Sequence, residues 1–242
     1  ASTLAVNVSA TLAKKHQQCC LVDLHPGRGD LDGMLDVKPQ FTLADLCLNQ
    51  SRLDRAMFEK TLTRHDAGIH LLSAPPQWTD SRAVSPEGVS LALNMARKIY
   101  SHVVVDLEDC FHDEQVKVLQ QTTHLLLVFR LEFAGLRNAR RSLEHLDNLG
   151  VARRKIRLVA NRFGQPNELP PDEVEEALGQ KIAFYVPNDP KTANGAHNTG
   201  IPVVLKEPGC KLAQSLSELA NLEADTRGAT VVQGSKVLAF AH

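Results

Sequence analysis

The chain has 242 residues, and 43% of them are hydrophobic, which is enough for one large core. Lys and Arg number 27 and Asp and Glu 28, so the formal net charge of -1 gives no overall attraction to nucleic acid or anionic membranes. The five cysteines form no C-x-x-C pair and no metal-ligand spacing, which indicates reduced thiols in a cytosolic protein. There is no signal peptide and no apolar run near 18 residues, so we predict no membrane-spanning segment.

Helices are predicted where apolar residues recur every three or four positions. The segment 86–100 is a strong example, because Pro86 and Glu87 stand in its first turn and apolar residues follow along one side. The other predicted helices cover residues 2–15, 41–48, 52–63, 113–121, 133–149, 171–178, 191–198 and 211–223.

Short apolar runs between these helices predict strands, most of which lack a polar face. They cover residues 18–23, 68–73, 101–107, 124–129, 155–161 and 182–186. Strands that alternate with helices indicate an α/β fold, with one mostly parallel sheet and helices on both faces. We assign residues 1–222 to this domain and residues 223–242 to a C-terminal tail, in which we expect at most a weak strand.

The sequence opens on a helix, with Leu4, Val8 and Leu12 on one face. In an α/β domain the first helix normally crosses over from a first strand. We therefore expect that a first strand and its loop lie upstream of Ala1 and are missing from this sequence.

Polar residues stand at several predicted strand ends and helix starts, which share one edge of a parallel sheet. A Ser or Thr at a helix start can bind phosphate or Mg²⁺, and an acid at the end of a buried strand can hold Mg²⁺ through water. Taken singly, each residue is equally well explained as a helix cap or a turn residue. The groups are Ser2-Thr3, the loop from Asp23 to Asp32, Asp106, Asn161-Arg162 and the loop from Pro187 to Pro190.

Seven stretches follow one another in the order A-S-T-L-A-V-N-V-S-A-T-L-A, L-V-D-L-H-P-G-R-G-D-L-D, L-L-S-A-P-P, V-V-V-D-L, L-V-A-N-R, V-P-N-D-P-K and G-I-P-V-V. This order resembles the ParA/MinD superfamily of deviant Walker-A ATPases, from residue 1 to about residue 220. Within the superfamily the resemblance is closest to the TadZ/CpaE branch, which helps to assemble and localise the Flp-type (Tad) pilus machinery. It implies a three-layer α/β/α fold of the P-loop NTPase type, with ATP and Mg²⁺ as cofactors.

The resemblance implies that the part of the site that binds the phosphates of ATP is weakened. Ala1, Ser2 and Thr3 match the end of the phosphate-binding loop, which normally reads G-K-T-T. Ser2 then falls at the Mg²⁺-binding hydroxyl and Ala1 at the phosphate-binding lysine, whose charge an alanine cannot supply. Asp106 matches the acid of the Walker-B strand and would also bind Mg²⁺.

The resemblance also separates the catalytic residues from the base-binding residues. Asp23 matches the first acid of a D-x-D motif, and His25 stands in place of the second, which positions the attacking water. A neutral imidazole cannot supply the same acceptor charge, so we expect weak hydrolysis. Asn161 matches the residue that recognises adenine and precedes Arg162, and the loop from Pro187 to Pro190, with Asp189, matches the segment beside the base.

Two surface features remain. Arg137, Arg140 and Arg141 concentrate positive charge on one helix, which we interpret as a solvated face in preference to a patch for a protein, DNA or lipid partner. No aromatic residues are interleaved with them, which argues against nucleic acid as a partner. Trp78, the only Trp, is either an exposed partner anchor or a partly buried lid residue.

The leading hypothesis is a cytoplasmic TadZ/CpaE-like pilus assembly and localisation factor. It would form a homodimer across the nucleotide face and dock on pilus or secretion machinery at the inner membrane or cell pole, with at most a peripheral membrane association. One alternative is an active partitioning or positioning ATPase of the ParA/MinD type. Another is a structural α/β module that binds no nucleotide.

Overall fold

A computed structural model describes residues 1–108, 110–224 and 235–241. Within these ranges, eight strands form one sheet in the order β2-β3-β1-β4-β8-β5-β6-β7. Every neighbouring pair is parallel except β2 and β3. The strands are β1 (Cys19–Leu24), β2 (Thr63–Arg64), β3 (Ile69–Leu72), β4 (His102–Leu107), β5 (His124–Phe129), β6 (Ile156–Phe163), β7 (Ile182–Pro187) and β8 (Lys236–Ala241).

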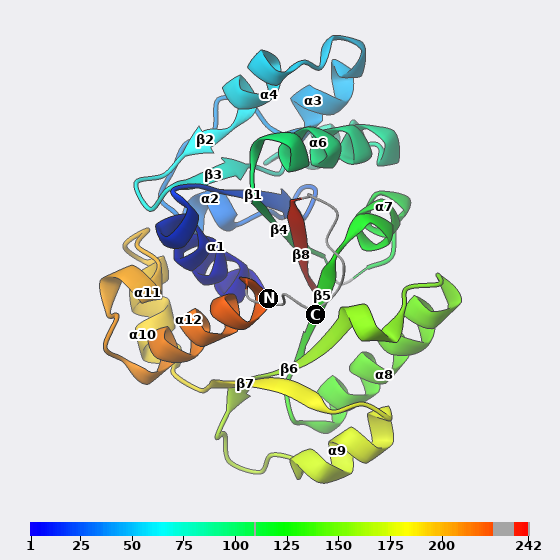
Figure 1. Ribbon diagram of the computed structural model, residues 1–242, viewed down its shortest axis with the longest axis vertical. Helices are drawn as coiled ribbons and strands as arrows, with labels where there is room; N and C mark the ends of the chain where they lie inside the picture. Colours follow the sequence, from blue (N-terminus) through cyan, green and yellow to red (C-terminus); the bar gives the residue numbers. More distant parts are fainter. Residues whose placement is uncertain (109, 225–234, 242) are drawn as a thin grey trace.

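Helices cover both faces of this sheet and give the three-layer α/β/α architecture that the sequence predicts (Figure 1). One hydrophobic core lies beneath α1 (Ser2–His16), α2 (Leu31–Met34), α10 (Pro190–His197), α11 (Val203–Lys206) and α12 (Lys211–Ala224). The other lies beneath α3 (Leu43–Leu48), α4 (Arg55–Thr61), α6 (Pro86–Ile99), α7 (Asp113–Gln121), α8 (Phe133–Asn148) and α9 (Pro171–Leu178). The short α5 (Trp78–Ser81) buries none of its residues.

The predicted elements are confirmed, and α7, α9 and β5 have the predicted bounds. The sequence analysis missed α2, α5, α11 and β2, because segments of two to four residues are too short to show a hydrophobic period. No helix in the described part of the chain is long and apolar enough to cross a membrane.

The main difference lies at the C-terminal end, where we expected a tail with at most a weak strand. Residues 236–241 instead form β8, which pairs with β4 on one side and β5 on the other. Val237 and Ala239 enter one core and Leu238 and Phe240 the other, and all four are fully buried. The sequence analysis underestimated this strand because a six-residue run carries little information about distant pairing partners.

The position of β8 places it next to the first helix. Phe240 lies beside Asp106 of β4, so β8 runs toward the same sheet edge as β4. In Figure 1 this edge lies beside the beginning of α1. Residues 236–241 therefore supply a strand in the middle of the sheet, next to the helix for which we expected an upstream strand.

Helix α1 is held firmly at this edge because it is buried between the sheet and α12. The buried Asn7 fixes it further, since its Oδ1 accepts a hydrogen bond from the backbone N–H of Val204 at 3.0 Å and its Nδ2 donates to the carbonyl of Thr3 at 2.8 Å. The beginning of α1 is thus placed rigidly at the carboxyl edge of the sheet.

Candidate functional site

Two buried acids stand at the carboxyl ends of neighbouring strands. Asp23 of β1 and Asp106 of β4 are register partners, and they are 2% and 1% exposed. Buried carboxylates are costly unless they are paired or hydrogen-bonded, so the partners of each acid decide its role.

Asp23 is satisfied by its own loop. Its Oδ1 accepts from the backbone N–H of His25 at 3.1 Å, and its Oδ2 accepts from that of Leu31 at 3.2 Å. A Cβ atom at Gly29 would lie 2.5 Å from Oδ2, so only glycine lets the loop approach the carboxylate this closely. Asp23 therefore organises the loop from His25 to Leu31, which agrees with the cap interpretation of this residue.

Asp106 lacks such partners. Among the described residues, no donor meets hydrogen-bond geometry with either side-chain oxygen. Burial raises the pKa of Asp106 to about 6, and the charges of His25 and of the amino group of Ala1, together with Ser2, oppose part of that rise. A buried carboxylate without hydrogen bonds requires an explanation such as an ion or a water molecule. Asp106 therefore fits the ligand interpretation better than the cap interpretation.

The donor set around Asp106 suits Mg²⁺ bound together with a phosphate ligand. No group of three or more His, Cys, Asp or Glu side chains in the described ranges is arranged to hold a metal by itself. Mg²⁺ in nucleotide sites typically has one or two carboxylates, water and the phosphates themselves as ligands. Asp106 and the hydroxyl of Ser2 provide such a partial set.

His25 lies between the two acids and is 17% exposed. Its Nδ1 is 3.3 Å from Asp23 Oδ1 and 3.6 Å from Asp106 Oδ2. Burial lowers the pKa of His25, but the hydrogen bond to Asp23 and the charges of both acids outweigh burial, so the pKa is raised overall. The shift therefore favours the protonated form of the ring at the position where the resemblance implies an acid.

Two adjoining cavities begin at the first residues of α1. The larger, of about 570 Å³, is lined by residues 1–3, the ends of β5 and β6 and the first turns of α8. The smaller, of about 110 Å³, lies between α1, the end of β7 and α10. Both are lined by Thr3, Asn161, Arg162 and His197, so the two cavities share a common wall.

The predicted nucleotide-binding residues divide between these cavities. Ala1 and Ser2 line the larger cavity, whereas Pro187 and Asp189 line the smaller one. Asp189 also has a structural role, since its Oδ1 accepts from the backbone N–H of Thr192 at 3.0 Å and caps α10. The hydrogen bonds from Thr192 hold the pKa of Asp189 below its usual range.

Asn161 and Arg162 sit where β6 departs from regular pairing with β7. Asn161 Oδ1 accepts from the backbone N–H of Arg162 at 2.9 Å, and Arg162 has a φ of 56°, in the left-handed region. This turn places both residues where the two cavities join.

The sequence analysis missed Arg130 and His197, which also line the site. The Nε2 atom of His197 lies 3.2 Å from the hydroxyl of Thr3, and burial lowers the pKa of its ring. Arg130 follows β5 directly, so the rule that found Asp23 and Asp106 at strand ends would have found it as well. No comparable signal in the sequence marks His197.

The structure does not bring the two surface features together. Arg137, Arg140 and Arg141 are exposed on α8, which follows β5, and Arg140 pairs with Glu144 at 3.0 Å. Trp78 is 61% exposed in α5, which follows β3, and the guanidinium carbon of Arg28 lies 5.2 Å from the centre of its ring. Since β1, β4 and β8 separate β3 from β5, these residues form no common patch.

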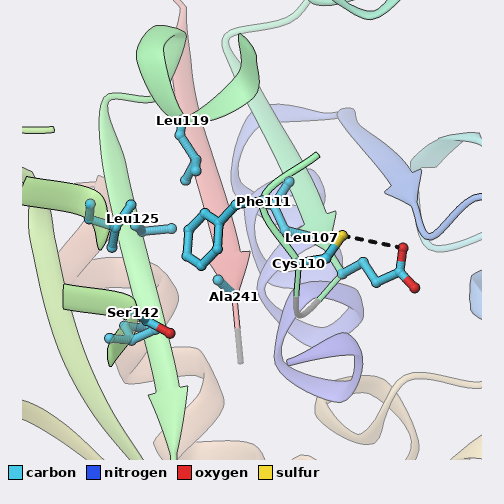
Figure 2. Close-up of a pocket in the computed structure, with 10 residues that line it drawn as sticks. Leu107, Cys110, Phe111, Leu119, Leu125, Ser142 and Ala241 are labelled. Carbon is cyan, nitrogen blue, oxygen red and sulfur yellow. Dashed lines mark hydrogen bonds between the residues drawn. The ribbon is translucent and has the colours of Figure 1, made fainter. Parts of the chain in front are cut away.

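A third cavity, beyond the end of β4, is too small for a ligand (Figure 2). Its volume is about 10 Å³, which is room for about one water molecule. The thiol of Cys110 donates to Glu108 Oε2 at 3.6 Å, and burial raises the pKa of this thiol to about 11. The lining is mostly apolar and includes Leu107, Phe111, Leu119, Leu125 and Ala241.

Comparison with known proteins places this geometry in a fold family. No family model matches the chain. The septum site-determining protein MinD of Thermotoga maritima is 23% identical over 211 residues, which cover 84% of this chain and 76% of that protein. A ParA family ATPase from Chlorobium tepidum has a TM-score of 0.86 at 23% identity, with 91% of this chain and 92% of that chain covered. MinD from Pyrococcus horikoshii, complexed with Mg-ADP, has a TM-score of 0.78 at 20% identity, covering 95% and 93%. The chain thus has the fold of the ParA/MinD P-loop ATPases.

Proposed function

We propose that the chain binds ATP with Mg²⁺, hydrolyses it weakly or not at all, and uses the bound nucleotide to control self-association and docking. The observation that carries the proposal is the contrast at the sheet edge. Asp106 is buried near Ser2, which lines a cavity of nucleotide size, whereas His25 stands where catalysis needs an acid.

The two cavities suit the two ends of a nucleotide. The larger cavity contains the Ala1 to Thr3 segment, which would lie against the phosphates. The smaller one, with Asn161 and Pro187 in its lining, would receive the adenine. Asp106 and Ser2 would hold Mg²⁺, which neutralises the charge of the phosphates when it is bound. The structurally similar MinD from Pyrococcus horikoshii is complexed with Mg-ADP.

The weak hydrolysis follows from the environment of His25. Orienting an attacking water requires a group that accepts its proton or a hydrogen bond from it. The Nδ1 atom of His25 is directed at Asp23, and the two acids favour the protonated ring. A protonated imidazole only donates hydrogen bonds, so it cannot take the role of the second acid.

A protein that binds nucleotide without rapid turnover can act as a stable platform. On the TadZ/CpaE resemblance, we propose that it forms a homodimer across the nucleotide face and docks on Tad pilus machinery at the cytoplasmic face of the inner membrane or at the cell pole. The similarity to MinD and ParA proteins favours a second candidate, an active partitioning or positioning ATPase.

Calorimetric titration of the chain with ATP and Mg²⁺ tests the shared part of these proposals. We expect saturable binding that is weakened by Asn161→Ala, with Leu222→Ala on the exposed face of α12 as the matched control. An absence of binding would favour the structural module without nucleotide. Sedimentation with and without ATP then tests the dimer, which should form only when nucleotide is present.

A further inference from the structure

The larger cavity lacks a lysine at its phosphate end. Ala1 lines the cavity at the position where the resemblance places the phosphate-binding lysine. A phosphate chain at neutral pH carries several negative charges, and binding it without a cationic partner is costly. One Mg²⁺ offsets only part of this charge, so a positive side chain from another element would complete the site.

Two arginines line this cavity, and their positions differ. Arg162 also lines the smaller cavity, so it stands at the junction of the two. Arg130 lines only the larger cavity, the one that contains Ala1, Ser2 and Thr3. Of the two arginines, Arg130 is thus the one that lines the cavity of Ala1 and Ser2 without also lining the smaller cavity.

The backbone of Arg130 is fixed while its side chain remains able to move. A side chain at Gly135 would collide with the carbonyl oxygen of Arg130, so the first turn of α8 packs directly on that residue. The side chain of Arg130 is 45% exposed, and its Nη1 is 3.8 Å from Glu132 Oε1. An exposed ion pair at this distance contributes little, so it does not hold the guanidinium away from an anion.

From this geometry we propose that Arg130 binds the phosphate chain of the nucleotide and supplies the positive charge that Ala1 lacks. The guanidinium of an arginine presents parallel N–H donors that match two phosphate oxygens. The ligand class is a nucleoside di- or triphosphate, in agreement with the proposed function on which this inference rests. Glu132 would lose its weak pairing with Arg130 when the anion enters.

The test is a comparison of ligands that share a base and differ in phosphate. The affinities of ATP, ADP and adenosine are measured by calorimetry on the full chain and on Arg130→Ala. We expect the variant to lose about tenfold to hundredfold in affinity for ATP and ADP, and to bind adenosine as the parent chain does. Arg130→Lys should restore part of the loss, because it keeps the charge without the paired donors.

Arg141→Ala is the matched control, since Arg141 is an exposed arginine on α8 that does not line the cavity. It should bind all three ligands normally, and thermal unfolding should confirm that each variant is folded. Unchanged ATP affinity in Arg130→Ala, or an equal loss for adenosine, would overturn the role of Arg130 and leave the proposed function standing. If the parent chain bound none of the three ligands, the proposed function and this inference would fall together.

Discussion

The buried acid at the end of β4 gives the sharpest stability prediction, the effect of Asp106→Asn. The pKa of Asp106 is raised from 3.8 to about 6 because burial disfavours its charged form. At about 1.4 kcal/mol per pH unit, that difference corresponds to about 3 kcal/mol. Asparagine has nearly the same shape and does not ionise. We therefore expect Asp106→Asn to stabilise the chain by up to about 3 kcal/mol at pH 8.

The sign of the pH dependence follows from linkage. The folded chain holds the proton on Asp106 more tightly than the unfolded chain does, because its folded-state pKa is the higher of the two. Stability from this group is greatest below pH 3.8 and falls as the pH rises through about 6. The gain from Asp106→Asn should consequently be small near pH 4 and reach its full size above pH 7.

The assay is urea unfolding of both proteins between pH 4 and pH 8, first without ligand and then with ADP and Mg²⁺. Ligand should stabilise the parent chain more than Asp106→Asn, because only the parent chain keeps the carboxylate for the metal. Asp23→Asn is the control, and it should destabilise the chain, since Asp23 accepts several hydrogen bonds. A destabilised Asp106→Asn, or a gain that does not change with pH, would refute the assignment of Asp106 as a metal-ligand residue rather than a structural one.

Three further outcomes follow. Phe240→Ala should lower the free energy of unfolding in urea by about 3–5 kcal/mol, because Phe240 is fully buried in β8. Leu222→Ala should lower it by less than about 0.5 kcal/mol, because Leu222 is 54% exposed. Equally small effects would mean that β8 is not a core strand. Burial lowers the pKa of His102 to about 4, so the stability that its neutral ring contributes is lost as the pH falls from 6.5 toward 4. The free energy of unfolding of His102→Gln should therefore change less over this pH range than that of the parent chain. An equal change in both proteins would mean that the ring is solvated in the folded chain. Trp78 packs against Gly27 and Arg28 of the loop from His25 to Leu31. Its fluorescence should therefore change when ATP and Mg²⁺ bind and stay the same with adenosine. Identical changes for both ligands would mean that this loop does not respond to the phosphates.

The fold was largely predictable from the sequence, because most of its signals are local. The apolar run that ends at Asp106 and the Pro86 start of α6 each identify an element without reference to the rest of the chain. The strand β8 was underestimated for the opposite reason. Its pairing with β4 and β5 joins segments more than one hundred residues apart, and no local pattern encodes that choice.

The positions of the site residues were predictable from the sequence, whereas the role of each residue was less so. The rule that parallel strands share their carboxyl edge correctly placed Asp23 beside Asp106. Which acid is satisfied depends on the close approach of Gly29 to Asp23, a three-dimensional contact. Similarly, His197 reaches Thr3 across 194 positions of the chain, so its place in the site could be seen only in the folded structure.

On the proposed function, His25 keeps a nucleotide-binding site nearly inactive, and the decisive measurement is the rate of phosphate release from ATP. The measurement compares the parent chain with His25→Asp, which restores the second acid beside Asp23, at saturating ATP and Mg²⁺. We expect saturable ATP binding with very slow phosphate release from the parent chain, and at least about tenfold faster release from His25→Asp, since a positioned general base typically contributes at least 10². Rapid release from the parent chain that Asp106→Ala abolishes would refute this role of His25.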